Sequence, residues 1–170
     1  IEQNDTYWGP TYTKDSSDEN FTVKGDLRVD APNTTAAWAY VGNTYRINWT
    51  TFGTIQSVNL SYTNLSGTGS WVNIPECTNV NASLQYCNWT VPDYVNSDVR
   101  VKITDTANPA TNDTSEINFI IAGKILINAP SGGATWIVDN TRQINWTPTG
   151  SFSNVTILGS VNNFSSNWTI

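Results

Sequence analysis

Residues 44–50 read TYRINWT, and residues 57–62 read SVNLSY. In both stretches large apolar residues alternate with polar ones, as Ile47 and Trp49 alternate with Asn48. Because successive side chains of a strand point to opposite faces, this period of two is typical of a β-strand with one buried and one solvated face. The two stretches therefore predict neighbouring strands of a half-buried sheet.

The same alternation recurs along residues 26–123, and turn-rich segments such as NLSGTG (64–69) separate the strands. The sequence shows no helical period. Seven short alternating strands in about 97 residues predict an all-β fold, an immunoglobulin-like or fibronectin III-like β-sandwich. We expect the strands at residues 27–31, 44–50, 57–62, 70–74, 85–91, 99–105 and 116–121.

The chain repeats itself at a spacing of about 97 residues. Gly25 and Gly123 are 98 residues apart, and RINWT (46–50) returns 97 residues later as QINWT (143–147). A fixed period of this length indicates tandem domains. We therefore expect a complete sandwich at 26–123, followed at 124–170 by the first half of a second one.

The repeat also predicts a role for residues 1–25. ENFTV (19–23) is the counterpart of INFII (117–121), which lies in the last strand of the complete sandwich. Residues 1–25 are therefore expected to be a donor segment or the tail of a preceding domain. Two explanations stay open: the chain is an excerpt of a longer tandem array, or a whole subunit that completes the half sandwich of a neighbouring copy. In the second, Phe21 and Val23 would enter the neighbour's groove, and the head-to-tail contact would generate a filament.

N-glycosylation sequons are the most frequent motif in the sequence. Thirteen of the 22 Asn residues begin Asn-X-Ser/Thr with X other than Pro, where chance would give about five. In the predicted strands the sequon Asn falls on the polar face, so a glycan there would stay outside the core. The alternative is a polar, Asn-rich β surface with accidental sequons. The predicted acceptors are Asn4, Asn20, Asn33, Asn48, Asn59, Asn64, Asn81, Asn88, Asn112, Asn145, Asn154, Asn163 and Asn167.

Cys77 and Cys87 are the only two cysteines. Zinc sites need four ligands and often include His, which the chain lacks. A disulfide is therefore the better interpretation, and two free buried thiols are the alternative. The pair lacks the immunoglobulin Cys…Trp…Cys layout and would instead close the loop between the fourth and fifth strands. A disulfide indicates an oxidising compartment, so we expect an extracellular or cell-surface protein.

The composition argues against several classes of function. The net charge is −6 and the eight basic residues form no run, which speaks against nucleic-acid binding. No apolar stretch reaches roughly 18 residues, so no membrane span is expected. Without His no Ser triad can form, and the scattered carboxylates predict no catalytic pair, so we expect neither an enzyme nor a bound cofactor. The candidate calcium ligands are Asp105 and Asp113 with Asp30 or Asp26, against the alternative of solvated turn acids.

The Trp residues have two candidate roles. Trp49, Trp89 and Trp146 lie in the apolar phase of their strands, which predicts packing in the core. Trp38 and Trp136 lie beside loops, which makes them the candidates for exposed, sugar-stacking positions. They equally suit a role as plugs at the end of the sandwich.

Two longer segments resemble a known class of proteins. NAPSGGATWIVDNTRQINWTPTGSFSNVTIL (128–158) and CNWTVPDYVNSDVRVKITDTANPATNDTSEINFII (87–121) are similar to the tandem Ig-like repeats of very large bacterial and archaeal surface proteins. They are also similar to the Ig-like domain of yeast cell-wall Ser/Thr-rich proteins. The resemblance covers about 145 residues and implies a fold and a surface context without a catalytic motif. The Cys pair and the sequon density depart from that class, and the density favours a heavily glycosylated surface filament, such as archaea build.

These features predict a structural subunit or repeat of an extracellular, N-glycosylated filament or surface array. Its partners would be copies of itself, joined head-to-tail by β-strand complementation. The alternative is an adhesin or carbohydrate-binding stalk module of a cell-surface protein, with cell-surface glycans as partners.

Overall fold

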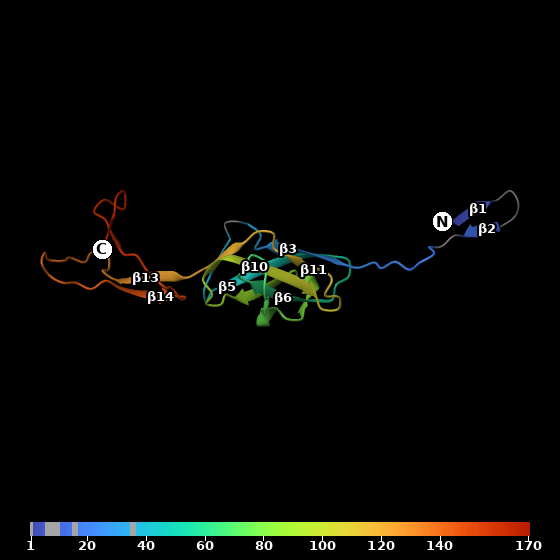
Figure 1. Cartoon of the computed structure of the whole chain (residues 1–170), viewed down its shortest axis with the longest axis horizontal. Coiled ribbons are helices and arrows are strands. Elements are labelled where there is room, and N and C mark those ends of the chain that lie inside the picture. Colours follow the sequence, from blue (N-terminus) through green and yellow to red (C-terminus); the bar gives the residue numbers. More distant parts are fainter. Residues whose placement is uncertain (1, 6–10, 15–16, 35–36) are drawn as a thin grey trace.

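The computed structural model describes residues 2–5, 11–14, 17–34 and 37–170. Residues 26–122 form a β-sandwich, which occupies the centre of Figure 1. Two short 3-10 turns interrupt it, η1 (Pro75–Cys77) and η2 (Ala82–Leu84). Its strands are β3 (Asp26–Ala31), β4 (Trp38–Tyr40), β5 (Thr44–Phe52), β6 (Ser57–Thr63), β7 (Val72–Asn73), β8 (Val80–Asn81), β9 (Tyr86–Thr90), β10 (Asn96–Asp105), β11 (Asn112–Thr114) and β12 (Phe119–Ala122).

The strands divide between two sheets. The larger sheet has the order β4-β12-β10-β6-β7, with β11 also paired to β10 and β8 also paired to β6. The smaller sheet has the order β3-β5-β9. The sandwich therefore begins in the smaller sheet with β3, and the chain crosses at β4 to the edge of the larger one, where β4 runs parallel to β12. The expected all-β sandwich is confirmed, and each of the seven predicted strands overlaps an observed one.

The core lies between the two sheets and is built around a few large rings. Ile47 and Trp49 of β5 and Trp89 of β9 face Phe119 of β12, and all four are buried. The ring of Trp89 meets that of Phe119 edge-on, with centroids 6.3 Å apart. The indole N–H of Trp49 donates to the Ala82 carbonyl at 3.0 Å, so its one polar group is satisfied inside the core.

Residues 124–170 form two separate two-stranded sheets. Their strands are β13 (Lys124–Ala129), paired with β14 (Asn145–Thr149), and β15 (Leu158–Gly159), paired with β16 (Trp168–Thr169). The β13–β14 pair reproduces the β3–β5 pair residue by residue, including the register shift two residues before the end of the first strand. For example, Ile127 opposes Trp146 as Val29 opposes Trp49.

The N-terminal residues form a hairpin of β1 (Glu2–Asp5) and β2 (Thr11–Lys14). Residues 17–25, which include the expected donor motif at 19–23, lead to β3 without pairing to any strand in the described part of the chain. A strand needs a neighbour to satisfy its backbone groups, and a single copy of this chain offers none there. Figure 1 shows this segment in blue, between the hairpin and the sandwich.

Candidate functional site

The predicted glycan acceptors lie at the surface. The side chain of Asn4 is outside the part of the chain that the structure describes, and none of the other twelve acceptors is buried. Asn48 lies between buried Ile47 and Trp49, and Asn88 lies between buried Cys87 and Trp89. The predicted phase of these strands is therefore correct. Asn33, Asn48, Asn59 and Asn64 are half-buried, and the remaining eight are exposed.

Several acceptor amides are held in place by the fold. Asn81 Oδ1 accepts hydrogen bonds from the Ser83 N–H at 3.0 Å and from the Ser83 hydroxyl at 2.8 Å. This carbonyl role fixes the amide at the start of η2 and turns Nδ2, the atom that carries a glycan, away from both contacts. Asn64 Nδ2 donates to the Tyr94 hydroxyl at 2.6 Å. An amide nitrogen has two hydrogens, so one substituent can be added while that bond is kept.

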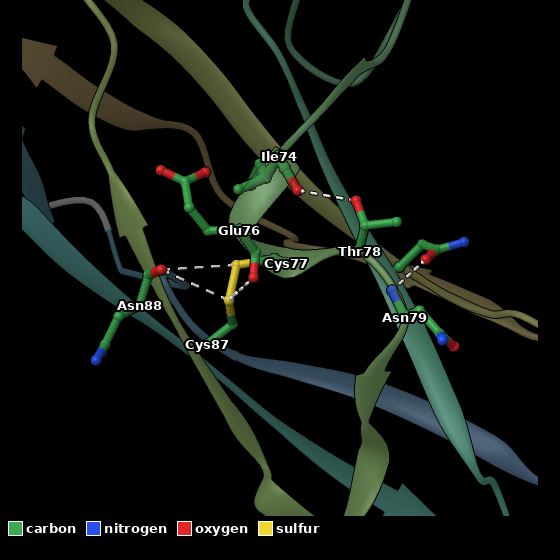
Figure 2. Close-up of a disulfide and its surroundings, with 8 residues drawn as sticks. Ile74, Glu76, Cys77, Thr78, Asn79, Cys87 and Asn88 are labelled. Carbon is green, nitrogen blue, oxygen red and sulfur yellow. Dashed lines mark hydrogen bonds between the residues drawn. A yellow bond between two sulfur atoms is a disulfide. The ribbon is translucent and has the colours of Figure 1, made fainter.

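Cys77 and Cys87 form the predicted disulfide, shown in Figure 2. Cys77 lies in η1, in the segment that joins β7 to β8, and Cys87 lies in β9. Because β7 belongs to one edge of the larger sheet and β9 to an edge of the smaller one, the bond ties the two sheets together at that side of the sandwich. Both cysteines are buried. The prediction that the bond closes the loop between the fourth and fifth strands is confirmed.

A polar contact anchors the disulfide loop to β6. The Asn79 N–H donates to Asn59 Oδ1 at 2.7 Å, so a predicted glycan acceptor on β6 anchors this loop. The pKa of Glu76 in the same loop is lowered because its carboxylate accepts from its own backbone N–H, an effect that outweighs partial burial, with a further contribution from Thr90. The loop is therefore tied to β6 by the Asn79–Asn59 bond as well as by the covalent link.

Phe21 and Val23 are the predicted polymer contacts, and both are exposed, at 79% and 83% of their surface. Their counterparts 98 residues later, Phe119 and Ile121, are both 0% exposed. Two copies of one motif thus stand in opposite environments within one chain.

An open apolar groove lies in residues 124–170. Ile127 is 62% exposed and Trp146 is 37% exposed, whereas Val29 and Trp49 at the matching positions are 2% and 1% exposed. Trp146 was predicted to be a core residue, and it differs because the short β15–β16 pair lines one side of this groove but leaves it open. The groove is lined by Ile125, Ile127, Ile144, Trp146, Val155 and Leu158.

Trp38 and Trp136 are both exposed, as predicted for the residues beside loops. Trp38 lies beside Tyr40, with ring centroids 6.3 Å apart and ring planes inclined by 35°. The ammonium of Lys124 lies 4.4 Å from the Tyr40 ring, so that ring is partly covered. The inclined planes and the covered ring leave Trp38 as the more accessible of the two aromatic surfaces.

The candidate calcium ligands serve other bonds. Asp113 Oδ2 accepts the Val29 N–H at 2.7 Å, and Asp105 Oδ1 accepts an N–H of its own turn at 2.9 Å. Asp30 Oδ1 accepts from Arg28 Nε at 2.7 Å. Among the described residues, no three His, Cys, Asp or Glu side chains gather closely enough to hold a metal ion.

The pKa of Asp30 is lowered. Its partial burial raises the pKa, but hydrogen bonds from the Thr50 hydroxyl and from Arg28, together with the charge of Arg28, outweigh that effect. Arg28, Asp30 and Thr50 therefore form a surface hydrogen-bond network across the β3–β5 pair. The Asp30 carboxylate serves as an acceptor within this network.

The joint between the sandwich and residues 124–170 was not predicted from the sequence. Asp93 accepts two hydrogen bonds from Ser151, one from its N–H and one from its hydroxyl. The signal was present in the repeat, because Gly53-Thr54 returns 97 residues later as Gly150-Ser151. A glycine followed by a hydroxyl residue at the same position of both repeats is therefore the sequence signal for this joint.

No protein-family model, curated protein or solved structure matches this chain. None of the helical turns in the described residues has the length and apolar character needed to cross a bilayer.

Proposed function

We propose that this chain is a structural unit of an extracellular, heavily N-glycosylated filament or surface array, in which immunoglobulin-like sandwiches follow one another and are completed by strands from outside each unit. One observation carries the proposal: Phe21 and Val23 are exposed, while Phe119 and Ile121 at the repeated positions fill a core. Phe21 and Val23 repeat two residues that fill the core as part of β12. Their exposure is best explained if this segment is a strand that becomes buried in a sandwich outside its own chain.

The open groove supplies the matching acceptor. In the complete sandwich β5 has two neighbours, β3 and β9, whereas its counterpart β14 has only β13. Likewise β6 pairs with β10 on one side, whereas the counterpart of β10 beside β15 is missing from the described chain. Unpaired strand edges beside an apolar groove favour the addition of further strands. An added strand pairs the free backbone N–H and C=O groups of the edge, and its side chains cover the apolar groove.

Residues 1–25 have the properties of a donor. They offer an extended segment and a hairpin, and the motif DSSDENFTVKG (15–25) corresponds to DTSEINFIIAG (113–123). In the complete sandwich the second motif holds β11 and β12. The strands that β14 and β15 lack come either from a neighbouring copy or from further chain. Both arrangements place sandwiches in series, and a non-closing series is a fibre.

The disulfide and the sequons support an extracellular setting. A disulfide persists in oxidising compartments, and surface sequons are acceptors in exported proteins. Glycans on the polar faces of β5, β6 and β9 would shield the sheets from proteases and from edge-to-edge association without entering the core.

The test uses the Phe21→Asp, Val23→Asp double variant. Native mass spectrometry and negative-stain imaging of undenatured wild-type material should show glycosylated filaments far larger than the 18.7 kDa chain. The double variant should give monomers, because two carboxylates cannot enter an apolar groove without a large desolvation cost. The control is Leu65→Asp with Leu84→Asp, which changes two equally apolar, exposed residues outside the motif and should polymerise normally.

Discrete, unglycosylated wild-type monomers would contradict the proposal. Filaments whose denatured chain is much longer than 170 residues would instead identify a tandem array. Filaments that dissolve into single glycosylated copies would identify non-covalent strand donation.

The second candidate function is an adhesin or carbohydrate-binding stalk module, and exposed Trp38 favours it. Indole rings present a flat apolar face on which a sugar ring can stack, and Trp38 offers one such accessible face. Trp38→Ala should then abolish binding to a glycan array, whereas the Phe21→Asp, Val23→Asp variant should bind normally.

A further inference from the structure

The joint after the sandwich is held by a carboxylate. Asp93, in the turn that follows β9, presents both oxygens to residues 149–152: Oδ1 accepts the Ser151 N–H at 2.8 Å and Oδ2 accepts the Ser151 hydroxyl at 2.7 Å. Two hydrogen bonds from one residue to one carboxylate fix both position and orientation.

Two glycines let the chain pass close to that loop. A Cβ added at Gly123 would lie 2.6 Å from the Thr149 carbonyl oxygen and would press against the Phe152 ring. Gly150 has φ of +97°, and a Cβ there would lie 3.2 Å from Gly123 Cα. The backbones at 123 and 150 therefore touch, and only glycine allows the contact.

The same arrangement occurs where the chain enters the sandwich. A Cβ at Gly25 would lie 3.0 Å from the Phe52 carbonyl oxygen and 2.8 Å from Ile55 Cγ1, as at Gly123. Gly53 has φ of +77°, and its Cβ would lie 3.3 Å from Gly25 Cα. Residues 52–55 thus reproduce residues 149–152, at a constant spacing of 97 residues.

Thr54 takes the place of Ser151, but nothing docks on it. It carries the same two donors, an N–H and a hydroxyl, and it is exposed. Within the described residues neither donor has a hydrogen-bond partner. At the second joint the equivalent donors of Ser151 bond to the carboxylate of Asp93, which belongs to the sandwich on the other side of Gly123.

We propose that residues 52–55 are the docking surface for the end of a preceding β-sandwich, whose carboxylate at the position of Asp93 accepts the N–H and hydroxyl of Thr54. The proposal rests on the serial arrangement proposed above and adds how consecutive units are oriented. One contact is not reproduced: Lys124, which lies over the Tyr40 ring, corresponds to Asp26. The carboxylate bonds are therefore the polar contacts that both joints share.

The test inserts a second copy of residues 26–123 between Gly25 and Asp26 of the full chain. The Thr54 of the original sandwich then has a preceding Asp93, while the Thr54 of the inserted sandwich does not, so one sample holds the docked and the free form. Amide hydrogen exchange by NMR should be slower at the docked Thr54 by about tenfold, with a downfield shift of its amide proton.

Asp93→Ala in the inserted copy alone should remove the difference between the two Thr54 amides. Asp98→Ala in the same copy is the matched control, because it removes an exposed acid elsewhere on that sandwich and should change neither amide. Thr54→Ser at the docked position should keep the protection, since Ser is the residue at 151. Two Thr54 amides with equal shifts and equal exchange would overturn the proposal.

The two proposals fail separately. If filaments form in native material but the Thr54 amides are alike, units are in series without this joint. If the Thr54 amides differ but native material is monomeric and unglycosylated, the joint exists and the filament does not.

Discussion

Phe119→Ala and Phe21→Ala form a matched pair, because the same substitution falls on the same motif position in two environments. Phe119 is fully buried against Trp89 and Tyr45, with ring centroids 6.3 and 6.2 Å away. Truncating a buried Phe costs about 3–5 kcal/mol in lost transfer energy and cavity formation. For a domain of this size each kcal/mol lowers Tm by about 4–8 °C, so the expected fall is roughly 12–40 °C.

Phe21→Ala should change the free energy of unfolding of the monomer by no more than about 0.5 kcal/mol, because the side chain is 79% exposed. The assay is thermal unfolding of dissociated, monomeric chains, followed by fluorescence of buried Trp49 and Trp89. The same variant should lower the stability of the assembled material, where the Phe21 ring is expected to be buried.

Two results would refute this reasoning. If Phe21→Ala destabilised the monomer as much as Phe119→Ala, the segment would pack within its own chain. If it left assembled material unaffected, residue 21 would contribute no core contact in any state. The pair Val23→Ala and Ile121→Ala gives an independent repeat of the comparison.

Three further predictions concern the disulfide, the surface network and the joint. Reducing Cys77–Cys87 should lower the free energy of unfolding by about 3 kcal/mol, since a short loop is released in the unfolded chain; superimposable urea curves for oxidised and reduced protein would contradict this. The pKa of Asp30 is lowered from 3.8 in the folded state, so its contribution is present above that value and is lost as pH falls through the folded pKa. The difference in urea midpoint between wild type and Asp30→Asn should therefore be full at pH 7 and disappear in acid, and a constant difference would show that charge is not its cause. Gly123→Ala should leave unfolding of the first sandwich unchanged but let the two parts tumble independently in ¹⁵N relaxation, whereas unchanged relaxation would show that the close approach at 123 is dispensable.

The strands that sequence could predict are those with a long, regular alternation. β5, β9 and β10 were predicted because each carries several apolar residues at a period of two, so the pattern outweighs local irregularity. β4 was missed because its three residues follow a Thr- and Ala-rich segment, and it is a strand only through pairing with β12, which is distant in sequence. Pairing of that kind leaves little trace in a short sequence window.

The burial of single side chains also depends on loops and neighbouring strands that are distant in sequence. Thr63 lies just past the strand predicted at 57–62 and is buried, because residues 64–69 fold back and its hydroxyl donates to the Thr68 carbonyl at 3.1 Å. Trp146 was expected inside, yet it is exposed, because the two-residue strands β15 and β16 of its own segment leave the groove beside it open. The sequon positions and the disulfide were predictable because phase and cysteine count depend on local sequence alone.

The parallel pairing of β4 with β12 bears on how a sandwich in such a series would resist pulling. β4 lies shortly after the point where the chain enters the sandwich, and β12 is the last strand before it leaves. The registered pairs Trp38–Ile120, Ala39–Ile121 and Tyr40–Ala122 run in the same direction. Tension applied at the two ends draws these strands past each other, so their hydrogen bonds are loaded in shear and must break together. An antiparallel pair pulled from the same side would open like a zipper, one bond at a time. Survival under load is set by the rate of unfolding rather than by equilibrium stability, and bonds that yield together slow that rate.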